Sequence, residues 1–158
     1  MVIFMLVKDV MKKPITVKDN DDLTEVIKLF REKRISGAPV LNDDGELVGI
    51  ISESDIIKTL TTHDEDLNLI LPSPLDLIEL PLKTAIKIEE FKEDLKKALK
   101  TKVKDVMTKD VVVAKPDMTI NDAAKLMVEH KIKRLPVVDE DGKLIGIITR
   151  GDIIEALV

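Results

Sequence analysis

Apolar and polar positions follow the same order in two separate stretches of this chain. Each stretch begins with a short β-branched run, residues 15–17 and residues 111–113, which predicts a strand. Apolar residues then recur with the i, i+3, i+4, i+7 spacing of a helix that buries one face. They are Leu23, Val26, Ile27 and Phe30 in the first stretch and Ile120, Ala123, Ala124 and Met127 in the second. A candidate N-cap residue with an acid three positions later precedes each helix, Asp22 with Glu25 and Thr119 with Asp122.

Two apolar runs follow each predicted helix, and an acidic turn that ends in glycine separates them. The runs cover residues 38–41 and 47–51 in the first stretch and residues 135–138 and 144–148 in the second. This pattern predicts a β-hairpin, with Gly45 and Gly142 in the turns. A last helix begins at Ser52 and at Thr149. Each stretch is therefore expected to form a β-α-β-β-α unit, which gives the chain an α/β (α+β) fold.

The two units are copies of one another. Residues 39–57 have the sequence PVLNDDGELVGIISESDII and residues 136–154 have the sequence PVVDEDGKLIGIITRGDII, at a constant offset of 97 residues. A repeat of this kind predicts that a site in one copy has a counterpart in the other. Each copy is close to the smallest size that folds alone, so we expect the copies to pack together and to form a cleft where they meet.

The segment between the copies has no duplicate. We divide the chain into a first repeat at residues 7–60, a linker at residues 61–102 and a second repeat at residues 103–158. Prolines 72, 74 and 81 oppose regular structure in the first part of the linker, which could cover a cleft or contribute to a dimer contact. Its second part, residues 86–100, predicts an amphipathic helix with Ile88, Phe91, Leu95 and Leu99 on one face. We favour a linker helix packed on the module over a partner-binding helix.

Composition narrows the function classes. A net charge of −5 and a pI near 5.2 argue against a broad nucleic-acid footprint. The sequence contains no Cys, which excludes disulfides and thiolate metal sites and fits a cytoplasmic location. The apolar start, residues 1–7, is too short to span a bilayer. Because we find no nucleophile–base pair and no metal-ligand spacing, we do not expect an enzyme.

The most specific chemistry lies where the last helix of each copy begins. Ser52 is followed by Asp55 and Thr149 by Asp152, each three positions later. In one interpretation these are capping boxes, in which hydroxyl and carboxylate satisfy the free N–H groups of the helix start. In the other, the helix start is an anion site and the aspartate accepts from a ribose diol. The motif alone favours the cap, although glutamate is the usual partner in a capping box.

Several motifs in the same order, twice, resemble the cystathionine-β-synthase (CBS) domain pair, the regulatory Bateman module. The motifs are Val10-Met11 and Val106-Met107, the ISGAPV and IKRLPV segments before the hairpins, and the GIISESDII and GIITRGDII endings. The resemblance implies a pseudo-two-fold sandwich of the repeats with two clefts. It also implies an adenosine-containing ligand, AMP, ADP, ATP or an S-adenosylmethionine derivative, and no catalytic cofactor.

The resemblance assigns roles residue by residue. Asp55 and Asp152 would each bind a ribose diol, and Ser52 and Thr149 would face the phosphate or the ribose. The adenine would lie among Ile15, Ile35 and Ala38 or among Val112, Ile132 and Leu135. Arg134, with Lys133 beside it, would reach the phosphate.

The copies differ at one point that bears on charge. Lys133 and Arg134 correspond to the uncharged Ser36 and Gly37. We therefore hypothesise that the Asp55 cleft gains two cations and prefers a phosphorylated adenosine, whereas the Asp152 cleft gains none. The alternative is that Lys133 and Arg134 are solvated on a hairpin edge.

The resulting prediction is a regulatory module, a homodimer, that binds an adenosine ligand and signals to a protein partner in trans. The first alternative is a structural dimerisation module without a physiological ligand. The second is an enzyme, against which the lack of a histidine base near Ser52 and Asp55 argues.

Overall fold

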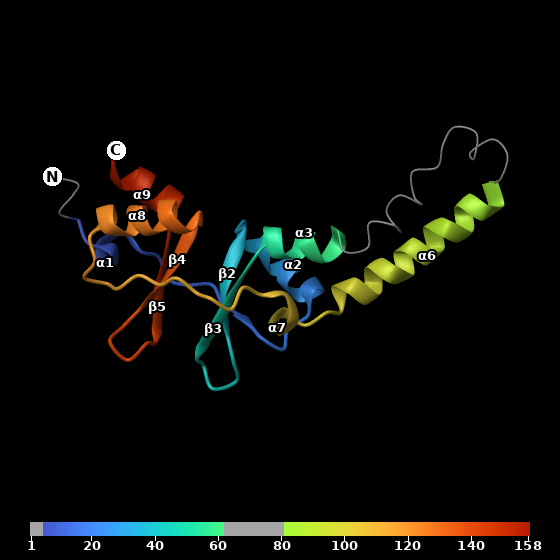
Figure 1. Ribbon diagram of the computed structural model, residues 1–158, viewed down its shortest axis with the longest axis horizontal. Coiled ribbons are helices and arrows are strands. Elements are labelled where there is room, and N and C mark those ends of the chain that lie inside the picture. Colours follow the sequence, from blue (N-terminus) through green and yellow to red (C-terminus); the bar gives the residue numbers. More distant parts are fainter. Residues whose placement is uncertain (1–4, 62–80) are drawn as a thin grey trace.

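The computed structural model of the protein describes residues 5–61 and 81–158. Its two repeats lie side by side, with their helices on one side and the turns of their hairpins on the other (Figure 1). The first repeat contains β1 (Val17–Lys18), α2 (Leu23–Lys33), β2 (Gly37–Leu41), β3 (Leu47–Ser52) and α3 (Glu53–Thr61). The second contains α8 (Ile120–His130), β4 (Arg134–Val138), β5 (Leu144–Thr149) and α9 (Arg150–Ala156). The predicted α/β fold of two related units is confirmed.

The hairpins have the same register in both copies. β2 pairs antiparallel with β3, and β4 with β5, and a bulge follows Val40 in one copy and Val137 in the other. Gly45 and Gly142 have φ values of 78° and 81°, the left-handed conformation that the turn requires. The predicted caps of the first helices are also present, since Asp22 accepts from the amide of Glu25 and Thr119 from that of Asp122.

The predicted first strands are largely wrong. β1 begins only at Val17, where it pairs parallel with β2, and residues 111–113 form no strand. Instead, Ala114 makes an isolated parallel bridge to Val137. The β-branched residues just before these positions, Ile15 and Val112, line clefts. Such residues favour any half-buried extended surface, so their presence does not prove a ladder.

The core of each repeat is completed by the first residues of the other repeat. Helix α1 (Val7–Val10) begins the first repeat in sequence, yet Val7 is fully buried in the core of the second. Helix α7 (Val103–Val106) begins the second repeat in sequence, and Val103 is fully buried in the core of the first. Beyond these helices, Lys12 forms a backbone bridge to Ile147 of β5, and Thr108 forms one to Ile50 of β3. We call residues 5–13 and 101–110 the two arms.

Helix α6 (Pro81–Leu99) includes the predicted linker helix. Its C-terminal end packs on the first repeat, where Ala98 is buried and the Thr24 hydroxyl donates to the Leu99 carbonyl at 3.4 Å. The rest of α6 extends away from the repeat (Figure 1). The predicted proline-broken loop before it lies outside the described residues, apart from Pro81. Within residues 5–61 and 81–158, no helix combines the length and apolar character needed to cross a membrane.

Candidate functional site

Two clefts lie where the repeats meet, one at each predicted Ser/Thr-x-x-Asp motif. The Asp55 cleft has a volume of about 550 Å³ and contains Ser52 and Asp55. The Asp152 cleft has a volume of about 420 Å³ and contains Thr149 and Asp152. Both volumes are in the range of small-molecule sites. Ser36, Lys133 and Arg134 line both clefts, so the two sites share a wall.

Asp55 and Asp152 lie in the first turns of α3 and α9, and the predicted capping box is complete at Thr149 and Asp152 but only half formed at Ser52 and Asp55, where the hydroxyl donates to the carboxylate. The Thr149 hydroxyl accepts from the Asp152 amide at 3.1 Å, and Asp152 Oδ2 accepts from the Thr149 amide at 2.9 Å. In the first repeat, Asp55 Oδ2 accepts from the Ser52 amide at 2.9 Å and from the Ser52 hydroxyl at 3.2 Å. The cap uses one carboxylate oxygen of each aspartate. The other oxygen, Oδ1, is held by the arm of the opposite repeat.

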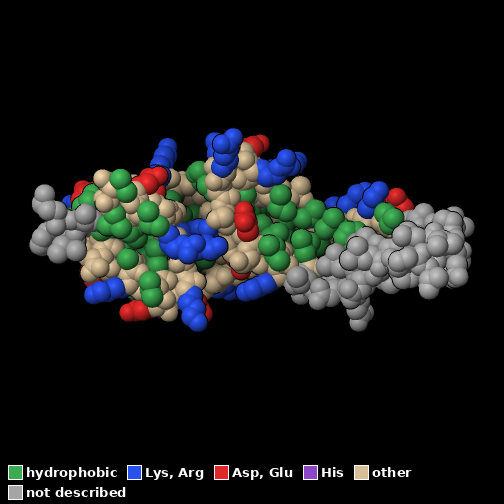
Figure 2. Space-filling view, turned by 90° about the horizontal axis from the view of Figure 1, so that it is seen from above, with side chains coloured by type: hydrophobic (Ala, Val, Ile, Leu, Met, Phe, Trp, Pro, Cys, Tyr) green, Lys and Arg blue, Asp and Glu red, His purple; other side chains and the backbone are tan. Residues whose placement is uncertain are grey.

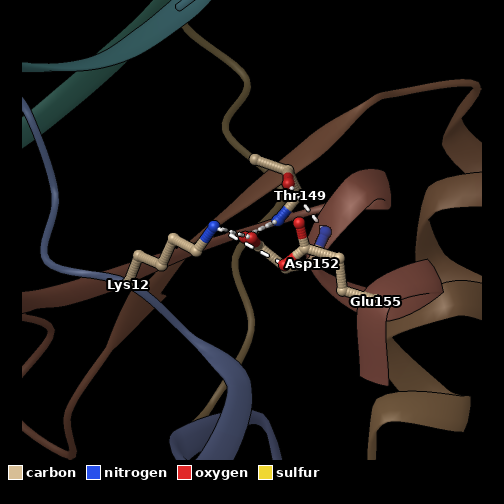
Figure 3. Close-up of polar contacts among 4 residues, drawn as sticks. All are labelled: Lys12, Thr149, Asp152 and Glu155. Carbon is tan, nitrogen blue, oxygen red and sulfur yellow. Dashed lines mark hydrogen bonds and ion pairs between the residues drawn. The ribbon is translucent and has the colours of Figure 1, made fainter. Parts of the chain in front are cut away.

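The two arms hold that oxygen differently. Lys12 Nζ lies 2.9 Å from Asp152 Oδ1 and 3.9 Å from a Glu155 carboxylate oxygen (Figure 3). The hydrogen bond and charge of Asp152 raise the pKa of Lys12 above its ordinary value. In the other cleft, the Thr108 hydroxyl donates to Asp55 Oδ1 at 3.3 Å. Lys12 and Thr108 are equivalent residues of the two arms, because Lys12 bridges to Ile147 of β5 and Thr108 to Ile50 of β3. One aspartate is therefore paired with a cation and the other with a neutral hydroxyl.

Arg134 lies between the clefts, where equivalent positions of the two copies meet. It begins β4, and its counterpart at the offset of 97 residues is Gly37, which begins β2. The guanidinium lies against Gly37, so that a Cβ added there would be 2.8 Å from Nε. Arg134 also donates to the Ser36 hydroxyl. Burial is the main cause that lowers the pKa of this guanidinium, and the Glu53 carboxylate opposes the shift. Arg134 is therefore partly buried and hydrogen-bonded rather than merely solvated on a hairpin edge, whereas Lys133 beside it is exposed, as the alternative expected.

The charge lining each cleft differs from the sequence hypothesis. Among the described residues, the Asp152 cleft is lined by six basic side chains and one carboxylate. The basic residues are Lys12, Lys13, Arg34, Lys133, Arg134 and Arg150. The Asp55 cleft is lined by four basic side chains (Lys58, Lys131, Lys133, Arg134) and three carboxylates (Glu53, Asp55, Asp110). The expectation that the Asp152 cleft gains no cations is wrong, because Lys133 and Arg134 face both clefts and an arm adds two lysines.

The structure sorts the other predicted residues between the clefts. Ile15 and Ile35 line the Asp152 cleft, and Val112 and Ile132 line the Asp55 cleft. Ala38 and Leu135 line neither, since both have no exposed surface and belong to the cores of their repeats. Their side chains therefore do not contact adenine as expected, because both lie on the face of their strand that packs into the core.

Sequence reasoning missed the residues of the arms and of the helix ends. Lys12 and Lys13 lie near the start of the first repeat in sequence but line the cleft of Thr149 and Asp152 in the second. Arg34 and Lys131 end α2 and α8 in the left-handed conformation, with φ values of 53° and 54°, and line one cleft each. The signal that could have found Lys12 is its place directly after the Val10-Met11 motif. Among the described residues, no cluster of three or more His, Asp or Glu side chains could hold a metal ion.

A second pair of hollows lies on the helical side. One groove between α2 and α3 is lined by Ile27, Phe30 and Ile57, and an equivalent groove between α8 and α9 is lined by Ala124, Met127 and Ile154, among others. Figure 2 views this side and shows hydrophobic side chains gathered over both repeats. The floors of these grooves are apolar, but charged residues also line them: Arg31, Arg34 and Glu53 in the first groove and Lys131, Lys133 and Arg150 in the second.

Comparison with known proteins gives one consistent result. The family model for the CBS domain matches residues 7–62 and 103–158. The chain is 77% identical over 154 residues to the uncharacterized protein MJ1426 of Methanocaldococcus jannaschii, which covers 98% of this chain and 92% of that protein.

Solved structures agree with this match. The structure of CBSX2 in complex with AMP, a protein of Arabidopsis thaliana, is 30% identical with a TM-score of 0.69 and covers 97% of this chain and 96% of that one. The CBS domain pair of protein MJ0100, in complex with 5′-methylthioadenosine and S-adenosyl-L-methionine, is 26% identical with a TM-score of 0.71 and covers 98% and 96%. The protein therefore belongs to the CBS domain family, and its two repeats form a CBS domain pair, or Bateman module.

Proposed function

We propose that this protein is a regulatory module, not an enzyme, that binds adenosine-containing ligands in its two clefts. The observation that carries the proposal is the preformed carboxylate in each cleft. The backbone of the helix start fixes Asp55 and Asp152 through Oδ2, and each keeps acceptor capacity on Oδ1 for a hydroxyl pair. Complexes of CBSX2 with AMP and of the MJ0100 domain pair with adenosyl ligands support the proposal.

Binding in these clefts has a physical route to regulation. Both clefts lie between the repeats, and each is lined by an arm that crosses from one repeat to the other. A ligand that contacts both repeats favours one of their relative arrangements and shifts that equilibrium. The regulated partner would be a separate protein in the cytoplasm, a location that a Cys-free chain fits. Two copies of the chain would form a homodimer, for which the grooves on the helical side provide a surface.

Thermal unfolding with a panel of adenosine, AMP, ADP, ATP and S-adenosylmethionine tests the binding step. A ligand at about 100 times its Kd adds roughly 2.7 kcal/mol to the free energy of unfolding. The Asp55→Ala/Asp152→Ala variant should lose this stabilisation. A matched control is Asp22→Ala/Thr119→Ala, which removes two helix caps that line neither cleft and should keep it.

The scaffold alternative has one observation in its favour, because local partners already use both oxygens of each aspartate. It predicts no thermal shift with any member of the panel. A shift that survives in Asp55→Ala/Asp152→Ala would likewise contradict binding at these carboxylates.

A further inference from the structure

The two clefts are built alike but differ in charge. Lys12 and Lys13 line the Asp152 cleft alone, and Glu53 and Asp110 line the Asp55 cleft alone. Counted over the described lining residues, the Asp152 cleft carries an excess of five positive charges and the Asp55 cleft an excess of one. A concave site with one sign of charge concentrates ligands of the opposite sign.

The ion pair of Lys12 increases this difference where the ligand would sit. Asp152 is only 5% exposed, and the ammonium of Lys12 at 2.9 Å offsets its negative charge. Lys12 itself is 62% exposed, so its ammonium can turn toward an anionic group without leaving a buried site. Asp55 has the neutral Thr108 hydroxyl in the equivalent place, and the charge of Arg134, which lines both clefts, acts on it as well.

We infer that the Asp152 cleft binds a phosphorylated adenosine, while the Asp55 cleft binds an adenosyl group without a phosphate, neutral or positively charged. This inference rests on the proposed function, since it assumes that both clefts take adenosine ligands. It reverses the hypothesis drawn from the sequence, in which the phosphate belonged to the Asp55 cleft. The charge assignment depends on side chains alone and not on the dipole of α9, which has only seven residues.

An amide titration with AMP and with adenosine separates the clefts. Gly151 lines the Asp152 cleft and Ser54, at the equivalent position, lines the Asp55 cleft. In ¹⁵N-labelled full-length protein, AMP should shift the Gly151 amide with a Kd about tenfold or more below that seen at Ser54, the effect of one well-placed charge-assisted contact. For adenosine, the Kd values seen at Gly151 and at Ser54 should differ much less.

A pair of arm variants ties the preference to the named cations. Lys12→Gln/Lys13→Gln should weaken AMP binding at Gly151 about tenfold and weaken adenosine binding there by a clearly smaller factor, because adenosine lacks the phosphate that the lysines attract. The control Lys104→Gln/Lys109→Gln removes the same charge from the other arm, at residues that line neither cleft. It should leave the affinity for both AMP and adenosine unchanged. An equal loss in the control, or no loss in the lysine variant, would overturn the inference.

The outcomes also separate this inference from the proposed function. If AMP shifts Ser54 first, or both amides equally, adenosine binding stands and the assignment of clefts is wrong. If no ligand shifts either amide at millimolar concentration, the proposed function fails and the inference fails with it.

Discussion

At the scale of single residues, the pair Gly37 and Arg134 explains why two copies of one unit are not identical. The positions are equivalent in the repeats and touch across the boundary between them. A side chain at position 37 would displace the Arg134 guanidinium, so glycine in one copy makes room for arginine in the other. The asymmetry that the sequence showed is thus first a matter of packing, and its consequence is that one guanidinium lines both clefts.

Substitution of Gly37 by alanine should displace the Arg134 guanidinium, the flexible end of its side chain, and destabilise the protein by about 1 kcal/mol or less. The reason is steric, because the added Cβ would collide with the Arg134 guanidinium and the φ of Gly37 is not in the left-handed region. Urea unfolding measures the change. In an Arg134→Ala background the same substitution should be nearly neutral, and a double-mutant cycle without coupling would contradict the explanation.

At the scale of elements, the helices and hairpins were predictable because their periodicity is local. The i, i+3, i+4, i+7 spacing predicted α2 and α8, and the acid-acid-glycine turns predicted both hairpins. The crossing of the arms was not predictable from the sequence. An apolar pattern indicates that Val7 and Val103 are buried, but it does not indicate which repeat's core contains each of them. The same limit hid Lys12, which lies 140 positions before Asp152 in the chain and next to it in the structure.

The crossed arms predict a non-local effect of a core substitution. Val7→Ala should destabilise the protein by roughly 1–3 kcal/mol, since it removes fully buried methyl groups. Hydrogen exchange should then increase mainly in β4, β5 and α8 of the second repeat, although Val7 belongs to the first repeat in sequence. Val103→Ala is the matched control and should loosen β2, β3 and α2 instead. Increased exchange confined to the repeat that follows each arm in sequence would contradict the crossing.

At the scale of the whole molecule, the clefts between the repeats offer sites for small ligands, and the helical side offers a surface for a protein partner. The clefts between the repeats carry the hydroxyl and carboxylate of each Ser/Thr-x-x-Asp motif, whereas the helical side carries two equivalent grooves with apolar floors and charged residues at their edges. Ile57 and Ile154 occupy equivalent positions in these grooves and are 57% and 61% exposed. Apolar residues gathered over both repeats are typical of a protein interface. The predicted homodimer would use this side and would link two pairs of clefts.

An Ile57→Glu/Ile154→Glu variant tests the homodimer. If two copies meet on the helical side, each glutamate must be buried without a partner or the dimer must dissociate, and dissociation is the less costly outcome. Light scattering after size-exclusion chromatography should therefore show a dimer for the wild type and a monomer for the variant. Lys143→Glu, beside the hairpin turn of the second repeat, is the control and should remain dimeric. Amide spectra with AMP should show at Gly151 that the monomer keeps its Asp152 cleft, which neither Ile57 nor Ile154 lines, whereas Ile57 also lines the Asp55 cleft. A variant that stays dimeric, or a wild type that is monomeric at every concentration, would exclude the helical side as the dimer interface.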